Sequence, residues 1–329
     1  MVAAEPGPRA TPTSGPAAPA PPPLAPIPVR PQRLVYLGTP AMAVSPLQAL
    51  VTSGWDVALV VTGADTRRGR GSATSPSPVK AAALELGLPV AHRVEEVLGA
   101  GADLGVVVAY GRLIRLPVLE RLGFVNLHFS LLPRWRGAAP VERALLAGDA
   151  ETGVCLMQLE EGLDTGPVFA HRRVPIDTRV TAAALRRQLV EIGSELLCTT
   201  LDTGLHDPTP QEGEVTYAAK LTPADLQIDW AATADVIDRV VRVGGAWTTW
   251  RGRRLKVLDA EPVDAADAGE PDETDETGGP APGALIGDDV TTGSGRLRLL
   301  TVQPEGKPAM AAAAWRHGAH PGPADRLGA

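Results

Sequence analysis

Residues 34–61, LVYLGTPAMAVSPLQALVTSGWDVALVV, indicate the fold class of this 329-residue chain. An apolar run over 34–37 leads into Gly38-Thr39-Pro40, and an amphipathic helical pattern follows and ends at Gly54. A second apolar run covers 57–61. Strand, tight turn, helix and strand in this order are typical of the βαβ unit, so these residues predict a parallel sheet.

The same alternation continues along the chain. Ser77-Pro78 predicts the start of a helix that reaches about Leu86, because serine is a favoured N-cap and proline suits the first helical position. Apolar runs over 106–109 and 124–128 predict two more buried strands. The predicted class is therefore α/β, with a doubly wound, mostly parallel sheet that binds ligands beyond the carboxyl ends of its strands.

The middle of the chain completes a first domain and begins a linker. Residues 153–159 and 167–176 predict two more strands, and a helix over 181–201 completes a domain at 33–207. Residues 208–226 are rich in turn-forming residues and predict a linker. Two domains joined by a linker agree with the length of the chain.

A smaller second domain is predicted at 227–315. A helix near 232–243 precedes short apolar runs separated by glycine turns, which are typical of a small β-barrel or sandwich. Residues 263–282 are rich in Asp, Glu, Gly and Pro and predict a flexible surface insertion, and residues 316–329 predict a tail. The short runs cover 246–250, 253–258, 283–286 and 296–303.

Residues 1–32 differ from the rest of the chain in composition. They hold eleven prolines and seven alanines without a hydrophobic period, so they predict an extended, disordered tail. The prolines at 21–23, 26 and 28 interrupt the apolar core that a signal peptide needs. The alternative is a proline-rich ligand for a partner domain.

Composition excludes several classes of protein. No run approaches the roughly 18 apolar residues of a membrane span, and two cysteines do not supply a disulfide scaffold or a Cys-rich zinc site. We therefore expect a cytoplasmic protein without a membrane partner. The net charge of −7 equals the seven acidic residues of 263–282, which contains no basic residue, so the remainder is neutral and compatible with binding one nucleic acid.

Familiar catalytic motifs are missing from the sequence. It contains no GxxxxGK[ST] phosphate loop, HExxH, GxSxG or CxxC. His317 and His320 form the sole histidine pair at a metal-ligand spacing, and they lie in a Gly/Pro-rich stretch. We therefore predict no metal.

Asn126 and His128 lie two residues apart at the end of an apolar strand. Strand geometry puts both side chains on one face, about 6.6 Å apart. An amide beside an imidazole suits stabilisation of an oxyanion and proton transfer. Asp164, in a glycine-flanked loop after another strand, can reach the same crevice and orient the imidazole. From these residues alone, a purely structural role at a strand end stays equally open.

A set of short motifs, in their order and spacing, resembles the folate-dependent formyltransferases. Asn126-x-His128 precedes Ser130-Leu131-Leu132-Pro133, and Asp164 of Gly162-Leu163-Asp164-Thr165-Gly166 lies thirty-six residues beyond His128. The resemblance spans almost all of 33–260 and resumes at 303–310. Its other motifs are Gly38-Thr39-Pro40, Gly69-Arg70-Gly71, Ser75-Pro76-Ser77-Pro78-Val79-Lys80, Val107-Val108-Ala109-Tyr110-Gly111, Arg136-Gly137-Ala138-Ala139-Pro140, Ala147-Gly148-Asp149-Ala150-Glu151-Thr152-Gly153, Thr216-Tyr217-Ala218-Ala219-Lys220-Leu221, Ile228-Asp229-Trp230 and Gln303-Pro304-Glu305-Gly306-Lys307-Pro308-Ala309-Met310.

The resemblance implies transfer of a formyl group from 10-formyltetrahydrofolate to the α-amine of methionine carried on initiator tRNA. It makes Asn126, His128 and Asp164 the catalytic trio. Asn126 and protonated His128 stabilise the tetrahedral oxyanion, while Asp164 orients His128 and helps to remove the proton from the attacking nitrogen. It also assigns Ser130, Leu131, Leu132 and Pro133 to the folate pocket.

Two groups of cations are expected to contact the tRNA. The first lies in the loop at 62–77 and the second in the C-terminal domain, which the resemblance identifies as barrel-like and similar to an OB fold. The first group is Arg67, Arg68 and Arg70, and the second is Arg253, Arg254 and Lys256.

Two rival functions follow from the same residues. One is a folate-dependent formyltransferase that acts on a small amine, such as a nucleotide sugar or glycinamide ribonucleotide. The other is a non-catalytic RNA-binding protein. The C-terminal domain and the arginine-bearing loop favour tRNA over a small amine, and the trio favours catalysis over binding alone. We expect the protein to act as a monomer.

Overall fold

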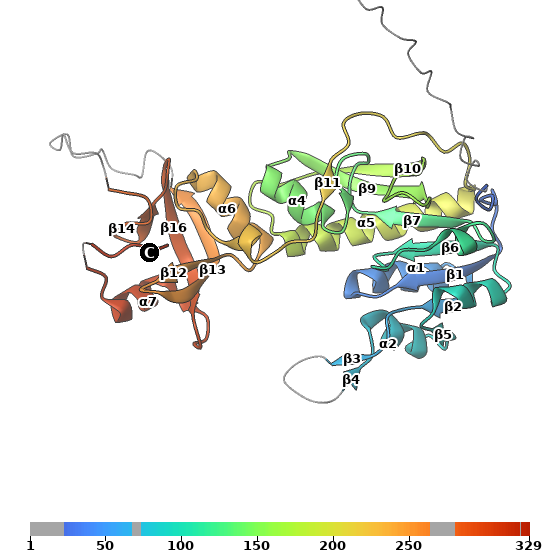
Figure 1. Cartoon of the computed structure of the whole chain (residues 1–329), viewed down its shortest axis with the longest axis horizontal. Coiled ribbons are helices and arrows are strands. Elements are labelled where there is room, and N and C mark those ends of the chain that lie inside the picture. Colours follow the sequence, from blue (N-terminus) through green and yellow to red (C-terminus); the bar gives the residue numbers. More distant parts are fainter. Residues whose placement is uncertain (1–22, 68–73, 264–279, 323) are drawn as a thin grey trace, which may run out of the picture.

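The computed structural model describes residues 23–67, 74–263, 280–322 and 324–329. Figure 1 shows two bodies along its long axis: an N-terminal body built on a parallel sheet and a C-terminal body built on a curled antiparallel sheet. Helix α6 (Ala234–Val243) belongs to the second body and packs against helix α4 (Pro140–Ala147) of the first.

In the described part of the chain, the N-terminal body is built on a seven-stranded sheet in the order β10-β9-β7-β6-β1-β2-β5. The run from β7 to β5 is parallel, whereas β9 and β10 are antiparallel to their neighbours. The predicted α/β class with a mostly parallel sheet is confirmed. The strands are β1 (Arg33–Gly38), β2 (Asp56–Val61), β5 (Val90–Ala91), β6 (Leu104–Val108), β7 (Phe124–His128), β9 (Glu151–Gln158) and β10 (Val168–Pro175).

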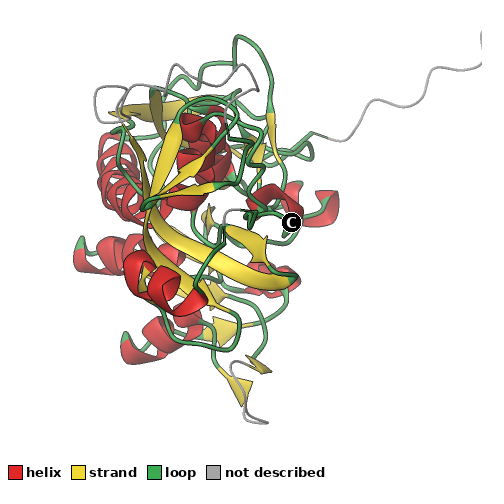
Figure 2. Ribbon diagram, turned by 90° about the vertical axis from the view of Figure 1, so that its left-hand side faces the viewer, coloured by secondary structure: helices red, strands yellow, loops and turns green. Residues whose placement is uncertain are grey.

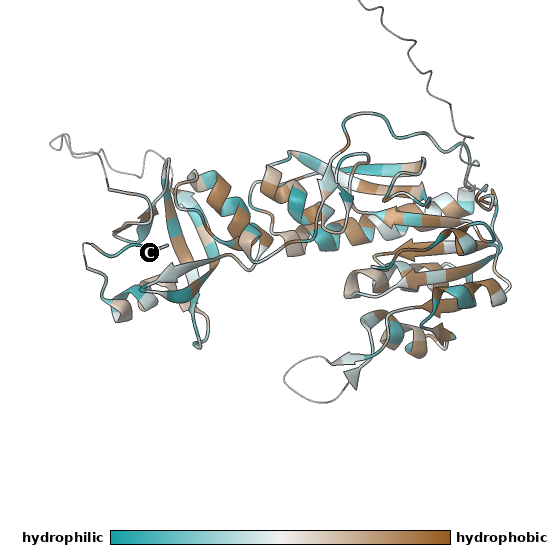
Figure 3. Ribbon diagram, in the orientation of Figure 1, coloured by the Kyte–Doolittle hydropathy of each residue, from teal (hydrophilic) through white to brown (hydrophobic). Residues whose placement is uncertain are grey.

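Each face of this sheet carries its own hydrophobic core, as expected of a doubly wound sheet. Leu34 and Tyr36 of β1 belong to the core on one face, and Val35 and Leu37 belong to the core on the other. Figure 3 shows hydrophobic residues concentrated along these central strands. Helices α1 (Val44–Thr52), α2 (Pro78–Glu85) and α5 (Ala182–Thr203) cover the first face, while α3 (Leu116–Leu119) and the 3₁₀ helix η2 (Val94–Gly99) cover the second.

The C-terminal body is a curled, half-barrel sheet of six described strands, seen in the foreground of Figure 2. Its order is β12-β13-β16-β15-β14, with β17 beside β16. Its core holds Trp230, Leu255, Leu297 and Trp315, so the predicted β-barrel-like domain is confirmed. The elements are β12 (Trp247–Trp250), β13 (Arg253–Val263), β14 (Leu285–Ile286), β15 (Asp289–Thr291), β16 (Arg296–Pro304), β17 (Met310–Ala311) and α7 (Ala312–Ala319).

Short elements join the longer ones. Two small strand pairings and two 3₁₀ helices lie between the major units, and the pair β8–β11 links the first body to the segment that leads to the second. These elements are η1 (Ala41–Ala43), β3 (Thr66–Arg67), β4 (Thr74–Ser75), β8 (Arg136–Gly137), β11 (Tyr217–Ala218) and η3 (Ala224–Leu226). No helix in the described residues is long and apolar enough to cross a membrane.

The expectation of a disordered tail over 1–32 is wrong for its last ten residues. Leu24 and Ile27 pack against the two cores of the N-terminal body. The backbone N–H of Ala25 donates to Leu119 at 2.8 Å, and Val29 accepts from Leu205 at 2.8 Å. Apolar side chains on a proline-stiffened, extended backbone are enough to hold this strap in place. Residues 1–22 lie outside the described residues, as do 264–279 of the acidic insertion.

The expectation of a tail over 316–329 is also wrong. Helix α7 continues to Ala319, and Leu327 is buried in the core of the C-terminal body. Leu327 forms a bridge with Trp250, and its backbone N–H donates to Gly283 at 2.9 Å. Buried Leu327, several backbone hydrogen bonds and the ion pair of Asp325 with Arg251 hold this end in place, and no periodic pattern in the sequence indicates these contacts.

Candidate active site

The carboxyl end of strand β7 lies between two kinds of pairing, parallel with β6 and antiparallel with β9. Asn126 and His128 lie at this end, and both are buried, with 8% and 5% of their surface exposed. Leu127 between them belongs to the hydrophobic core. Period-two alternation therefore puts the two polar side chains on one face of the strand and Leu127 on the other.

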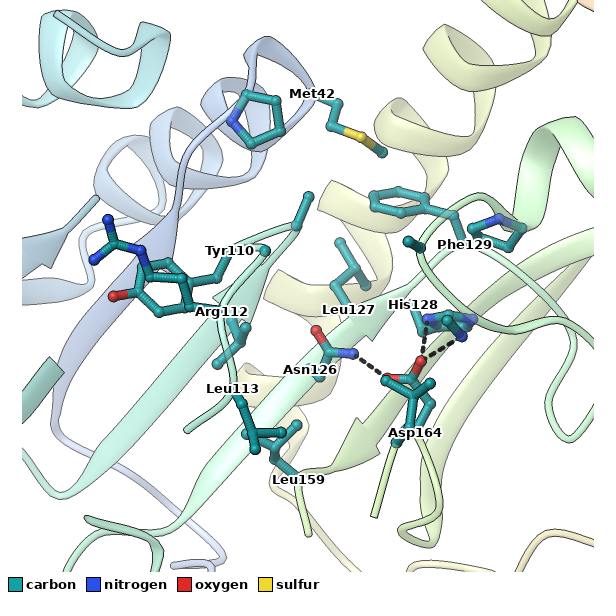
Figure 4. Close-up of a pocket in the computed structure, with 18 of the residues that line it drawn as sticks. Met42, Tyr110, Arg112, Leu113, Asn126, Leu127, His128, Phe129, Leu159 and Asp164 are labelled. Atoms are coloured by element: carbon teal, nitrogen blue, oxygen red, sulfur yellow. Dashed lines mark hydrogen bonds and ion pairs between the residues drawn. The ribbon is translucent and has the colours of Figure 1, made fainter. Parts of the chain in front are cut away.

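Asp164 comes to the same place from the loop between β9 and β10 (Figure 4). Its Oδ1 accepts from Nδ2 of Asn126 at 3.3 Å, and its Oδ2 lies 3.6 Å from Nδ1 of His128. The backbone N–H of Gly137 donates to Oδ2 at 2.7 Å. The structure thus brings together the three residues that the sequence singled out.

His128 is held from both sides of its ring. Nε2 lies 2.9 Å from the carbonyl oxygen of Trp135. A carbonyl can only accept, so Nε2 carries the hydrogen in this contact. Nδ1 faces the Asp164 carboxylate, and an imidazolium ring would donate to both partners at once. This arrangement suits a group that transfers protons.

A cavity of about 560 Å³ opens beside these three side chains. Its remaining wall is mostly apolar, and loops after β6 and β9 supply much of it. Burial raises the pKa of Tyr110 in this wall, although the nearby Arg112 opposes the shift, so the phenol stays neutral. Further lining residues are Met42, Val107, Leu113, Phe129, Val141, Leu159 and Leu163. The sequence predicted ligand binding beyond the ends of these strands but did not assign these apolar side chains to the pocket.

Residues 130–133, which the resemblance assigns to the folate pocket, follow the end of β7 directly. None of the four, all of them described, lies on the wall of this cavity. The Ser130 hydroxyl is buried and donates to the carbonyl of Arg134 at 2.6 Å, which closes a turn. This turn brings Trp135 back toward His128. The assignment of these four residues to the folate pocket stays a prediction.

The predicted tRNA-contacting cations lie on other elements. Arg67 ends β3, whose backbone pairs with β4, while Arg68 and Arg70 lie outside the described residues. Arg253, Arg254 and Lys256 are exposed on β13 of the C-terminal body. Arg254 lies over the ring of Trp247, 4.3 Å from its centroid, and Arg253 is 3.9 Å from Glu305.

The segment between the domains contributes residues that the sequence did not reveal. Gln211 donates from Nε2 to the backbone carbonyls of Asp164 and Gly166, both at 2.8 Å. Its Oε1 accepts from the guanidinium of Arg136. Gln211 lies among turn-forming residues without periodicity and outside the motifs quoted above, so nothing in the sequence marked it.

The described residues contain no group of three or more His, Cys, Asp or Glu side chains that could hold a metal ion. Cys155 and Cys198 are free, and Cys155 is buried on β9 opposite His128. At the site itself, the amide of Asn126 and the imidazole of His128 lie against the carboxylate of Asp164.

Comparison with known proteins gives matches over both bodies. The sequence profile of the family described as "Formyl transferase" matches residues 32–201, and that described as "Formyl transferase, C-terminal domain" matches 220–320. A methionyl-tRNA formyltransferase of Roseobacter denitrificans is 42% identical over 303 residues, covering 87% of this chain and 95% of that protein. Similar relatives with the same name occur in Rhizorhabdus wittichii, at 44% identity over 85% and 93%, and in Clavibacter sepedonicus, at 43% over 87% and 97%.

Solved structures with a similar fold are more distant in sequence. An N-formyltransferase from Helicobacter canadensis, in complex with folinic acid and dTDP-3-aminofucose, has a TM-score of 0.62 at 17% identity and covers 83% of this chain and 99% of its own. HypX from Aquifex aeolicus, in complex with tetrahydrofolic acid, has a TM-score of 0.58 at 17% identity and covers 88% of this chain. This chain spans 48% of the length of HypX. At these identities the likeness concerns the fold.

Proposed function

Because this chain belongs to the formyl transferase family, we propose that it transfers the formyl group of 10-formyltetrahydrofolate to the α-amino group of methionyl-initiator tRNA. The observation that carries the proposal is identity of 41–44% with methionyl-tRNA formyltransferases over both bodies of the chain. The product is N-formylmethionyl-tRNA, which serves translation initiation. The enzyme is a one-carbon transferase.

Asn126, His128 and Asp164 are proposed as the catalytic residues. The amine attacks the formyl carbon, and the formyl oxygen gains negative charge. Asn126 donates one N–H to Asp164, and its second N–H is free to donate to that oxygen. In the imidazolium form, His128 directs one N–H toward Asp164, and its other N–H can leave the Trp135 carbonyl for the substrate. Asp164 and His128 then move the amine proton to the departing folate nitrogen.

The cavity beside the trio is proposed as the pocket for the formyl donor. Its volume of about 560 Å³ falls within the range of roughly 300–1,000 Å³ typical of ligand sites. Apolar side chains such as Leu113 and Leu159 suit the rings of a folate, and Asn126 and His128 stand at its polar end. Ser130, Leu131, Leu132 and Pro133, which follow Phe129 of the cavity wall, are proposed to belong to the same folate site.

The acceptor is proposed to lie across both domains. The arginines of the 62–77 loop (Arg67, Arg68 and Arg70) and the exposed cations of β13 (Arg253, Arg254 and Lys256) would contact phosphates of the tRNA. We propose a catalytic domain at 33–207 with the strap 23–32 packed on it, a linker at 208–226, and a tRNA-contacting domain that begins at 227 and includes helix α7 and Leu327. We also propose that the protein acts as a monomer in the cytoplasm, where its substrates are made.

One assay tests the proposal against its rivals. The purified protein is incubated with 10-formyltetrahydrofolate and methionyl-initiator tRNA, and the formylmethionine released from the tRNA is measured. We expect product from the initiator tRNA. Product from amino sugars or glycinamide ribonucleotide in its place would support the small-amine reading, and tRNA binding without any turnover would support the RNA-binding reading.

Replacing the imidazole separates turnover from binding. We expect His128→Ala to lower kcat by about 10²–10⁴-fold, the range typical of a lost general acid–base group. Binding of the tRNA should remain within about threefold of wild type, since the exposed cations on β13 lie on a different element. Rapid-quench formylation and filter binding measure the two effects. A variant that turns over normally would contradict the role of His128.

A further inference from the structure

The segment that follows α5 passes close to the active site before it reaches the C-terminal domain. Thr209 exchanges two backbone hydrogen bonds with Val168 of β10, at 2.8 and 2.9 Å. Within residues 209–215, all of which are described, Gln211 alone is partly buried. An irregular, exposed stretch with one inward side chain indicates that this side chain has a specific task.

The amide of Gln211 has nearly all of its hydrogen-bonding capacity in use. Its two N–H groups donate to the carbonyls of Asp164 and Gly166, both at 2.8 Å. Its carbonyl oxygen accepts from Nη2 of Arg136 at 2.6 Å and from Nε at 3.1 Å. Gln211 therefore ties the Asp164 loop to the strand β8 on which Arg136 lies.

The Asp164 loop needs such support. Asp164 has φ of 50°, in the left-handed region that non-glycine residues seldom adopt. At Gly166 an added Cβ would lie 2.0 Å from the carbonyl oxygen of Gln158, so the loop passes very close to its neighbour. A backbone in this conformation persists when its surroundings hold it, and Gln211 binds the carbonyl of the strained residue itself.

The same segment also supports the other side of His128. The backbone N–H of Trp135 donates to Oγ1 of Thr216 at 2.9 Å, and the Arg136 N–H donates to the Thr216 carbonyl at 2.9 Å. The Trp135 carbonyl is the partner of His128 Nε2. Both partners of the imidazole, Asp164 and Trp135, are thus fixed by residues 211–216.

We propose that Gln211 is a positioning residue for formyl transfer, which holds Asp164 in line with His128 through the backbone of the 164–166 loop. The inference rests on the proposed function. Gln211 does not touch the reacting atoms, and it acts through Asp164. The separation of 3.6 Å between His128 Nδ1 and Asp164 Oδ2 leaves little room for further displacement before the pair is lost. Arg136 supports Gln211 and acts through it.

Two substitutions of Gln211 test this role. Gln211→Ala removes every contact of the amide. Gln211→Glu keeps an acceptor for Arg136 and removes both donors to the loop. We expect either change to lower kcat by about 10–100-fold, since misplacement of a catalytic group by about 1 Å costs rates of this order. The KM values for the folate and for the tRNA should stay within about threefold. Glu212→Ala, at the exposed next position, is the matched control and should retain wild-type kcat.

A double variant distinguishes positioning from general stabilisation. If Arg136 acts through Gln211, Gln211→Ala combined with Arg136→Ala should be no more than about threefold slower than Gln211→Ala alone. If the double variant lowers kcat by the product of the two single factors, Arg136 does not act through Gln211. A kcat within twofold of wild type for Gln211→Ala, or a loss confined to the KM for tRNA, would overturn the positioning role.

The activity of the wild-type protein, measured in parallel, separates this inference from the proposed function. Wild-type protein that forms no formylmethionyl-tRNA would refute the proposed function, and the positioning role would fall with it. An active wild type beside an unimpaired Gln211→Ala variant would refute the positioning role alone. Thermal unfolding of each variant, measured in parallel, shows whether a lost kcat reflects an unfolded protein. If Gln211→Ala proves unfolded, Gln211→Glu carries the test.

Discussion

Asp164 is the residue that connects the parts of the candidate active site. Its carboxylate accepts from Asn126 and Gly137 and faces His128, while its backbone stays in the left-handed region. This carboxylate orients the imidazole of His128 and holds the amide of Asn126. The residue therefore combines two tasks, and a substitution that preserves its shape can separate them.

Asp164→Asn keeps the size of the side chain and removes its charge. We expect kcat to fall by about a hundredfold or more, because the amide no longer stabilises an imidazolium at His128 and can present N–H to it. Single-turnover formylation measures the rate. The affinity for the folate, followed by fluorescence quenching, should change by less than about threefold. A rate near that of wild type would contradict the proposed role of the charge.

Cys155 offers a test of burial through pH. Burial raises the pKa of its thiol to about 11 from an ordinary value of 9, although the backbone of Leu132 and the charge of Arg173 oppose the shift. The folded state therefore holds the proton more tightly than the unfolded state. This stabilisation is complete below about pH 9 and is lost as pH rises toward 11, amounting to about 3 kcal/mol.

Unfolding by urea at pH 8 and at pH 10.5 measures this loss. We expect the free energy of unfolding to fall by about 2 kcal/mol more in wild type than in Cys155→Ala over this interval. Tyr36, whose pKa burial also raises, contributes equally to both proteins and cancels in the difference. Identical pH dependence in the two proteins would mean that the thiol is not the responsible group.

At the scale of elements, helix α2 shows how a local signal and a tertiary contact combine. Ser77 caps the helix, since its Oγ accepts from the Lys80 N–H at 3.0 Å, and Pro78 occupies the first helical position as predicted. The same Oγ lies 2.7 Å from Oγ1 of Thr62, and both residues are buried. Ser77 Oγ therefore takes part in both the helix cap and the buried hydroxyl pair with Thr62.

We expect Ser77→Ala to lower the free energy of unfolding by about 1–2 kcal/mol, because it removes the cap and leaves a buried hydroxyl without its partner. Chemical denaturation measures the change. The double variant Thr62→Val with Ser77→Ala leaves no buried hydroxyl without a partner. Its free energy of unfolding should therefore fall by less than the sum of the decreases in the two single variants. Strictly additive losses would show that the pair contributes nothing.

The elements that the sequence predicted well are those with strong local patterns. The apolar run predicts a strand at 124–128, and β7 occupies those residues; all five are buried, and Asn126 and His128 are its polar members. Helix α4 was not predicted, and the strap at 23–32 was taken for a tail, because packing against distant cores decides both. Gln211 lies 47 residues from Asp164, and no local pattern reports a contact of that kind.

For the whole molecule, a buried carboxylate joins the two bodies. Asp238 of α6 accepts from Arg242 on the same helix at 2.7 Å and from Arg179, in the loop before α5, at 3.1 Å. Arg179 also donates to the carbonyl of Ala260 on β13 at 3.1 Å. The side chain of Asp238 is 6% exposed, so its charge depends on these partners. The network fixes one body against the other.

We expect Asp238→Ala to destabilise the protein by about 3–5 kcal/mol, as removal of one partner from a buried pair does. Arg179→Ala should cost about 1 kcal/mol or less, since that side chain is 48% exposed. Tryptophan fluorescence during urea unfolding reports mainly on the C-terminal body, which holds Trp230, Trp247, Trp250 and Trp315, four of the six tryptophans. Equal losses for the two variants would contradict this account of the interface.

The path of residues 209–218 has a consequence for recombining the domains of this family. Helix α5, which covers the sheet of the N-terminal body, ends at Thr203. Gly204 is therefore the obvious junction for exchanging C-terminal domains between relatives. A chimera joined there would take its Gln211 and Thr216 equivalents from one parent and its Asp164 loop from the other. A junction after Ala219 keeps these partners together, and such hybrids should retain the rate of their catalytic parent while adopting the tRNA affinity of the other.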